Sequence, residues 1–442
     1  MASKILNPPE LEQTQTLVLA GGNGDRLRPL TDLRPKPTVS FGGMFRIIDF
    51  TLSNCFYSGL RRVSLLTQYK HDVLHRYVRE AWGELWSNTA PPDRSRLLFL
   101  PPPAGGSYKG TADAVFQNCN LLQSDGMDFV LVVSSDHIYH MDYRGLLRQH
   151  AESGADLTIG TVEYPISGAG QFGVLEVDRD LKVTSFEEKP ENPRPSPHTP
   201  SNAIVSMGVY VFRKDKLVAS LRQVCETGIG YDFGRDIIPW LLQSGRTDAY
   251  IFRDDPQNTA CYWRDIGTVD AYYEASMDLV QPHAPFNPYS NALWQSRPTR
   301  HPSFNGHSTA NPSRCMVGRA SVTRSILAPD IELADNASVD QSVLMPGVRV
   351  GNRARLRRAI VDEGVHIPAD FEVGYDLDRD RRLHTVTDGG VVVVSRTPVH
   401  QRPTIMHFTQ ATSARRTSAL EVSQPVRRAV NSFRSGMESG RG

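Results

Sequence analysis

The chain has 442 residues, with 49 basic and 48 acidic side chains and a formal net charge of +1. This length predicts two domains with additional segments, and the balanced charge argues against a nucleic-acid-binding protein. Five widely spaced cysteines form no CxxC pair, which favours a reduced, cytoplasmic protein. The N-terminus lacks a signal-peptide core, and no apolar run approaches the ~20 residues of a membrane span, so we expect no membrane association.

Between residue 14 and about residue 275, short apolar runs alternate with amphipathic segments. We predict strands at Thr16–Ala20, Arg62–Thr67, Phe129–Ser134, Asp156–Val162 and Val205–Phe212. We predict helices at Asp49–Ser58, His71–Leu85, Thr111–Gln123 and Tyr143–Ser153. This alternation is typical of a mostly parallel sheet with helices on both faces. Ligands of such folds bind at the carboxyl ends of the strands, so the residues after each strand are the candidates for a site.

The first predicted strand leads directly into a glycine-rich loop at residues 21–24. Glycines let backbone N–H groups approach a ligand that a Cβ atom would hold away, and exposed N–H groups bind anions such as phosphate. Arg26 and Lys36 follow, and both side chains can bind phosphate oxygens. The loop matches neither the Walker motif nor the dinucleotide fingerprint, and such a loop is often only a turn. The order of strand, glycines and cations nevertheless suggests a nucleotide-phosphate site.

Two acids are candidates for holding a divalent metal. Asp136 follows the apolar run Phe129–Ser134, although an acid there can also form a turn or cap a helix. Asp265 lies in an aromatic, glycine-containing turn at 262–268. Mg²⁺ is commonly held by one or two carboxylates while substrate phosphates supply other ligands. We expect Asp136 and Asp265 to form such a site.

Two further segments are candidates for contact with a ligand. Gly110 and Thr111 open a predicted helix whose N-terminus can face a ligand. Thr111 could also be a plain helix cap, and both could be true at the same time. Lys189 follows a strand and precedes Pro190, so its ammonium group can project into the cleft. Surface lysines are common, however, and few of them are functional.

The C-terminal part has a different pattern. Three repeats of 17 residues align without insertion, namely Ser325–Gln341, Ser342–Arg358 and Ala359–Tyr375. Apolar positions recur in register, as at Ile326, Val343 and Ile360. This regularity predicts a parallel β-helix with one coil per repeat rather than a two-layer sandwich. Gly389–Ser395 is predicted to be a closing strand.

In series, these motifs resemble those of the sugar-nucleotide pyrophosphorylases, and in particular the bacterial glucose-1-phosphate adenylyltransferase family. The blocks with this resemblance are Gly21–Leu27, Lys36-Pro37, Phe41–Phe50, Leu52–Asn54, Gly110–Ala114, Asp136–Tyr139, Glu188–Pro190, Ser206–Phe212, Asp232–Gly234 and Tyr262–Thr268. They follow the family's order over roughly residues 14–400. One block would carry little weight, whereas this many in order identify the chain as a member.

The resemblance implies an α/β fold, with a Rossmann-like nucleotidyltransferase domain followed by a left-handed parallel β-helix. The expected parts are an N-terminal arm at 1–13, a catalytic domain at 14–275, a linker at 276–313, the β-helix at 314–400 and a disordered tail at 401–442. The implied reaction transfers the adenylyl group of ATP to α-D-glucose 1-phosphate with Mg²⁺ as cofactor, giving ADP-glucose and pyrophosphate for glycogen synthesis. The family also implies a homotetramer controlled by small-molecule effectors.

The resemblance further implies the roles of individual residues. ATP would be bound by Gly21, Gly22, Gly24, Arg26, Gln68, Gly110 and Thr111. Glucose 1-phosphate would be bound by Tyr108, Gly173, Glu188, Lys189, Ser206 and Tyr210. The catalytic group would be Arg26, Lys36, Asp136 and Asp265, with the two aspartates as metal ligands.

The regulatory positions depart from the family pattern. Leu33 stands where allosteric members often carry a second lysine, Glu363 replaces an arginine, and Ser107 replaces an aromatic residue. Arg34 and Arg46 remain as candidates for an effector site. We therefore expect a weaker response to fructose 1,6-bisphosphate than in the lysine-bearing members, or a different activator.

Three alternatives remain. A sibling enzyme would make UDP-, dTDP- or GDP-sugars, but the blocks at 41–50 and 262–268 favour the adenylyl branch. A non-catalytic regulatory subunit would tend to lose the phosphate-binding cations, which are present here. A β-helix acyltransferase usually carries a catalytic histidine in its coils. His366 is the one histidine of the three repeats, and that reading leaves the nucleotide domain unexplained.

Overall fold

The computed structural model describes residues 9–88, 95–123, 126–253, 261–288, 303–305, 309–311 and 315–397. The predicted tail at 401–442 and the first eight residues of the predicted arm lie outside the described residues. Within the rest of that arm, Pro9–Glu12 form helix α1 and Leu11 is buried. None of the helices in the described ranges is both long and apolar enough to span a membrane.

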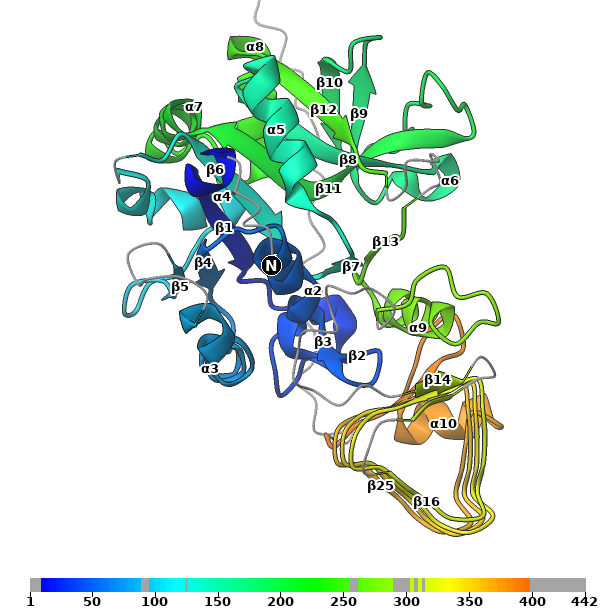
Figure 1. Cartoon of the computed structure of the whole chain (residues 1–442). Helices are drawn as coiled ribbons and strands as arrows, with labels where there is room; N and C mark the ends of the chain where they lie inside the picture. The colour runs from blue at the N-terminus through cyan, green and yellow to red at the C-terminus, as the bar shows by residue number, and fades with distance from the viewer. Residues whose placement is uncertain are drawn as a thin grey trace, which may run out of the picture. The chain divides into compact units, whose positions relative to one another are not determined.

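A nine-stranded sheet forms the centre of the first domain (Figure 1). Its parallel part has the order β6 (Phe129–Ser134), β1 (Thr14–Ala20), β4 (Arg62–Thr67) and β5 (Arg96–Leu100). The apolar runs form these strands because both faces of the sheet are covered. The prediction of β4 and β6 is confirmed at both ends, and β1 begins two residues earlier than expected.

The other half of the sheet is mostly antiparallel. Its strands are β8 (Leu157–Pro165), β9 (Gly173–Val177), β10 (Val183–Glu188), β11 (Asn202–Arg213) and β12 (Thr247–Ile251). Strand β11 pairs antiparallel with β6, β8 and β9, while β12 runs parallel to β8. The register of β11 against β8 shifts between Ser206 and Val209, where Gly208 has a φ of +67°. This bulge bends the strand at the edge where the candidate site lies.

Helices cover both faces of the sheet. They are α2 (Ile47–Tyr57), α3 (His71–Ser87), α4 (Thr111–Phe116), α5 (Tyr143–Ser153), α6 (Ile166–Ala169), α7 (Lys214–Leu221) and α8 (Ile238–Ser244). Helix α9 (Val269–Asp278) belongs to a separate core cluster. Successive residues of β1 face opposite ways, so Val18 packs with α2, α3 and α5 while Leu17 packs with α4, α7 and α8. The predicted helix from Thr111 leaves α-helical geometry after Phe116, and Cys119–Gln123 form a 3₁₀ turn.

Short strands complete the first domain and the segment after it. They are β2 (Ser40–Phe41), β3 (Phe45–Arg46), β7 (His137–Tyr139), β13 (Trp263–Asp265), β14 (Ser303–Asn305) and β15 (Thr309–Asn311). The predicted linker at 276–313 therefore contains the end of α9 and two strands.

The second domain is a parallel β-helix whose coils stack on three faces (Figure 1). One face contains β18 (Ser325–Leu327), β21 (Val343–Leu344), β24 (Ala359–Val361) and β28 (Val392–Val394). The second contains β16 (Met316–Val317), β19 (Glu332–Leu333), β22 (Arg349–Val350) and β25 (His366–Ile367). The third contains β17 (Ser321–Thr323), β20 (Ser338–Asp340), β23 (Arg355–Arg357) and β26 (Glu372–Val373). Helix α10 (Leu377–Leu383) and β27 (Thr385–Val386) precede β28.

The predicted 17-residue register is confirmed by the strand pairing. Ile326 pairs with Val343, Val343 pairs with Ile360, and Ile360 pairs with Val393 of the closing strand. These four side chains are buried in one cluster with α9 and with Phe41 of β2. The β-helix therefore shares a hydrophobic core with the part of the nucleotide domain that follows the glycine-rich loop.

Candidate active site

The glycine-rich loop follows β1 and borders two hollows at the carboxyl edge of the parallel strands. A cavity of about 370 Å³ is lined by Gly22, Gly24, Arg26, Lys36 and Asp136, among others. Gly24 has a φ of +67°, and a Cβ atom there would come within 3.1 Å of the Lys36 Cβ. A Cβ atom at Gly22 would meet no atom within 4 Å, so this face of the loop is open to the cavity. The loop has the form that an anion site requires.

Lys36 and Asp136 both line this cavity and form an ion pair. The Lys36 Nζ lies 2.7 Å from Asp136 Oδ2 and 3.7 Å from Asp265 Oδ1. Burial alone would raise the pKa of Asp136, but the charges of Lys36 and His137 and the hydrogen bond from Lys36 lower it well below its ordinary value. Asp136 is therefore an ionised carboxylate. The predicted cation, Lys36, thus lies close to both predicted acids, Asp136 and Asp265.

The two acids meet because β7 pairs antiparallel with β13, which places Asp265 directly opposite His137. The His137 Nε2 lies 3.5 Å from Asp136 Oδ1 and 3.6 Å from Asp265 Oδ1. One ligand atom from each of these three side chains lies within 4.8 Å of the others. Two carboxylates and an imidazole are a fitting donor set for a divalent cation.

His137 is not among the site residues predicted from the sequence. The sequence indicates His137 only by its position next to Asp136. This indication is weak because neighbouring side chains in a strand point to opposite faces. The imidazole packs edge-on against Trp263, with ring centres 5.1 Å apart. A Cβ atom at Gly208 would come within 3.2 Å of its Cε1. His137 is thus held in position between β13 and the bulge of β11.

Arg26 lies beside the same acids. A Cβ atom at Gly267 would stand 3.5 Å from the Arg26 Nη2 and 3.0 Å from Asp265 Oδ2. Glycine at that position therefore leaves room between the guanidinium and the carboxylate. The structure brings together all four residues of the predicted catalytic group: Arg26, Lys36, Asp136 and Asp265.

A second cavity of about 400 Å³ lies on the other side of the loop and includes Gly21, Gln68, Tyr108, Gly110 and Thr111 in its lining. The Tyr108 amide donates to the Gln68 side-chain oxygen at 2.6 Å. Tyr108, predicted as part of the sugar-phosphate pocket, thus lies with the residues predicted to bind ATP. Burial raises the pKa of the Tyr108 hydroxyl, so the group is neutral.

The start of α4 is tied to the segment at 231–233. The amide of Ala112 donates to the Tyr231 carbonyl at 2.8 Å. The Thr111 hydroxyl donates to Asp232 Oδ2 and accepts from the Phe233 amide, each at 3.0 Å. Thr111 does not cap its own helix, because the N-cap residue is Gly110. The alternative of a plain Thr111 cap is therefore wrong, and Thr111 links two loops.

The remaining predicted sugar-phosphate residues lie on β9, β10 and β11, except Lys189, which directly follows β10. Glu188 Oε2 would be 3.0 Å from a Cβ atom at Gly173 and 2.7 Å from one at Gly234. Burial raises the pKa of Glu188, an effect that Lys189 partly offsets. The Lys189 Nζ lies 3.7 Å from Glu188 Oε1, and its side chain is half exposed.

Ser206 and Tyr210 lie on either side of the bulge in β11. The Ser206 hydroxyl donates to the Tyr210 oxygen at 3.1 Å. Burial raises the pKa of Tyr210, whose ring stacks on Phe233 with centres 6.1 Å apart. Phe233 belongs to the segment that binds Thr111, so Tyr210 of β11 and the start of α4 contact the same segment.

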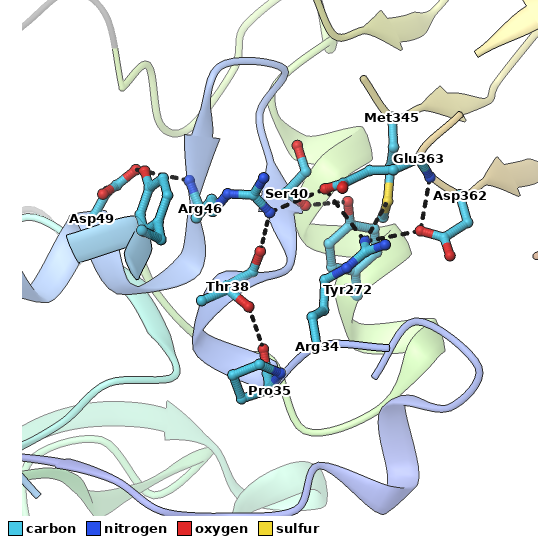
Figure 2. Close-up of polar contacts among 11 residues, drawn as sticks. Arg34, Pro35, Thr38, Ser40, Arg46, Asp49, Tyr272, Met345, Asp362 and Glu363 are labelled. Atoms are coloured by element: carbon cyan, nitrogen blue, oxygen red, sulfur yellow. Dashed lines mark hydrogen bonds and ion pairs between the residues drawn. The ribbon is translucent and has the colours of Figure 1, made fainter. Parts of the chain in front are cut away.

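The two candidate effector cations do not project into open solvent. Arg34 and Arg46 both pair with carboxylates of the β-helix (Figure 2). Leu33, in contrast, is about half exposed.

Comparisons with known proteins agree with this arrangement. The nucleotidyl transferase family model matches residues 15–282, and the model of a GlmU-like C-terminal hexapeptide domain matches residues 306–394. The fold and site are thus those of a nucleotidyltransferase joined to a hexapeptide β-helix.

Relatives that align over nearly their whole length show which family of nucleotidyltransferases the chain belongs to. The chain is 40% identical to a glucose-1-phosphate adenylyltransferase of Shewanella putrefaciens over 402 residues, which cover 87% of this chain and 95% of that protein. It is 39% identical to glucose-1-phosphate adenylyltransferase 2 of Vibrio cholerae over 403 residues, which cover 87% of this chain and 98% of the relative. The chain belongs to the glucose-1-phosphate adenylyltransferase family.

Proposed function

We propose that the protein transfers the adenylyl group of ATP to α-D-glucose 1-phosphate, releasing pyrophosphate and ADP-glucose for glycogen synthesis. The observation that carries the proposal is the convergence of Arg26, Lys36, Asp136 and Asp265 beside the open glycine loop. We also propose that the enzyme works in the cytoplasm, which its five free cysteines favour.

The proposed reaction requires mainly that the enzyme neutralise the charges of the two substrates and align them. A phosphate oxygen of glucose 1-phosphate is already anionic, so it needs no general base to attack the α-phosphorus of ATP. A new P–O bond forms in line as the bond from the α-phosphorus to the bridging oxygen breaks, and that electron pair leaves with pyrophosphate. Arg26 and Lys36 would stabilise the charge that builds on this leaving group.

We propose that Asp136 and Asp265 hold Mg²⁺, with His137 beside them. When bound, the cation would neutralise phosphate charge and help to orient the two substrates. In its absence Lys36 is the counter-ion of Asp136, so the ammonium and the metal would share these carboxylates.

The function is tested by measuring pyrophosphate release from ATP and glucose 1-phosphate in the presence of Mg²⁺. Parallel reactions with UTP, dTTP and GTP separate the adenylyl reaction from its siblings. A clear preference for ATP is the expected result. A preference for another nucleotide would assign the protein to a sibling enzyme. No release with any nucleotide would overturn the proposal.

Lys189→Ala should raise the KM for glucose 1-phosphate by about 10–100-fold, because a hydrogen bond to a charged group contributes about 1.5–3 kcal/mol. The kcat and the KM for ATP should change little, since the proposed contact is made equally in the ground and transition states. Lys182→Ala, which alters an exposed lysine near the other end of β10, serves as the control. An unchanged KM for the sugar phosphate would remove Lys189 from the pocket.

We further propose that the enzyme is a homotetramer with small-molecule effectors, and that fructose 1,6-bisphosphate activates it weakly. Initial rates measured over a range of ATP concentrations should show that the bisphosphate raises the apparent affinity for ATP by less than about fivefold, the lower end of typical allosteric coupling. The reason is that Arg34 and Arg46 already have carboxylate partners. A panel of glycolytic intermediates tests this, and a large activation by the bisphosphate would contradict it.

A further inference from the structure

Two arginines of the nucleotide domain meet two acids of the β-helix (Figure 2). The Arg34 Nη1 lies 2.9 Å from Asp362 Oδ1 and 3.3 Å from Glu363 Oε1. The Arg46 Nη1 lies 3.0 Å from the same Glu363 oxygen. Arg34 and Asp362 are both nearly inaccessible to solvent. One carboxylate oxygen is therefore shared by two guanidinium groups from different segments.

These arginines hold both ends of the turn that carries Lys36. Arg34 precedes Lys36 by two residues, with only Pro35 between them. On the other side, Arg46 donates to the backbone carbonyl of Thr38 (Figure 2). Thr38 is itself bonded back to the Pro35 carbonyl at 2.9 Å. The turn at 36–38 is thus anchored before and after the lysine by the same pair of acids.

The path from the β-helix to the candidate active site is short. Asp362 binds Arg34, the backbone continues through Pro35 to Lys36, and the Lys36 ammonium binds Asp136 at 2.7 Å. Pro35 fixes its own φ and so limits the freedom of this link. A displacement of Arg34 would therefore move the point from which the Lys36 side chain extends.

We propose that Asp362 and Glu363 are positioning residues for Lys36, acting through Arg34 and Arg46. The inference rests on the proposed adenylyl transfer only for its kinetic readout. Neither acid is among the residues that line the two cavities beside the glycine-rich loop. Asp362 and Glu363 neutralise Arg34 and Arg46. Removing either acid would leave an uncompensated buried charge, so the arginines would repel each other and no longer hold the turn at 36–38.

The test uses the full chain with Glu363→Ala and Asp362→Asn. Each variant should lower kcat for pyrophosphate release by about tenfold, with the KM values changed less than about threefold, because Lys36 acts on the leaving group in the transition state. Glu372→Gln is the matched control. It removes a β-helix carboxylate whose partner, Arg355, lies 2.6 Å away on an exposed face, and it should leave kcat unchanged.

Two further readouts separate positioning from general stability. Acetate should restore part of the kcat of Glu363→Ala, compared with chloride at equal ionic strength, and should leave the unsubstituted enzyme unchanged. Hydrogen exchange should accelerate at the amides of Thr38 and Val39, which bond to the Pro35 and Lys36 carbonyls, in both acid variants and not in the control. Exchange does not depend on activity.

The outcomes are distinct. If the unsubstituted protein releases no pyrophosphate, the proposed function is wrong. The positioning role is then tested only by hydrogen exchange at the amides of Thr38 and Val39. If it is active but Glu363→Ala and Asp362→Asn keep full kcat and unchanged exchange at 38–39, the positioning role is overturned. A fall in kcat that acetate does not relieve, accompanied by faster exchange throughout the β-helix, would also overturn it, since that result describes unfolding.

Discussion

Lys36→Ala is expected to lower kcat by about 10²–10³-fold while changing the KM values for ATP and glucose 1-phosphate far less. That is the typical effect of removing one group that stabilises charge in a transition state. Lys36 is mostly buried, and its ammonium lies 2.7 Å from Asp136 and 3.7 Å from Asp265. It is therefore held at the edge of the cavity where the pyrophosphate group would leave.

Steady-state kinetics of pyrophosphate release measure this effect, together with a thermal melt to show that the variant is folded. Lys36→Arg keeps the charge but replaces the compact ammonium by a planar fork, so it should recover only part of the rate. Lys216→Ala removes a partly exposed lysine that pairs with Asp156 at 3.5 Å, and it should behave like the unsubstituted protein. Retention of full turnover by Lys36→Ala would exclude the leaving-group role.

Asp136→Asn should reduce kcat/KM by about 10²–10³-fold or more. The substitution takes away one proposed metal ligand and also the counter-ion of Lys36. Removing a single group that stabilises charge in the transition state typically lowers the rate by about 10²–10³-fold. The asparagine side chain has nearly the same shape, so the loss reflects charge rather than packing.

Binding of Mn²⁺, followed by electron paramagnetic resonance, gives a readout that does not depend on turnover. The variant should bind the ion much more weakly than the unsubstituted protein. Asp215→Asn alters an exposed acid paired with Arg213 at 3.1 Å, and it should leave Mn²⁺ binding intact. Undiminished Mn²⁺ affinity in Asp136→Asn would show that the metal is held elsewhere.

Much of the architecture could be predicted because its signals are local. The strands at Arg62–Thr67 and Phe129–Ser134 are apolar runs buried on both faces, and the register of Ile326, Val343 and Ile360 repeats a single coil. The site depends on pairings distant in sequence. His137 lies beside Asp265 only because β7 and β13 are antiparallel neighbours. The sequence around either strand does not indicate that the two strands pair.

The arginines at 34 and 46 show a different limit of sequence reasoning. A pattern of residues identifies a cation but does not identify its partner. Their partners, Asp362 and Glu363, lie more than 300 positions along the chain, in a turn after β24. Both arginines are predicted as candidates for an effector site. Their carboxylate partners become apparent only with the packing of the β-helix against α9 and β2.

The regular stacking of the β-helix also restricts how the chain can change in length. Neighbouring coils are about 4.8 Å apart, whereas the contacts of Asp362 and Glu363 with the two arginines span 2.9–3.3 Å. One coil inserted or deleted before residue 359 would preserve the stack but move both acids past their partners. The number of coils between the linker and Asp362 is therefore fixed by the nucleotide domain, whereas coils added after β28 would leave these contacts untouched.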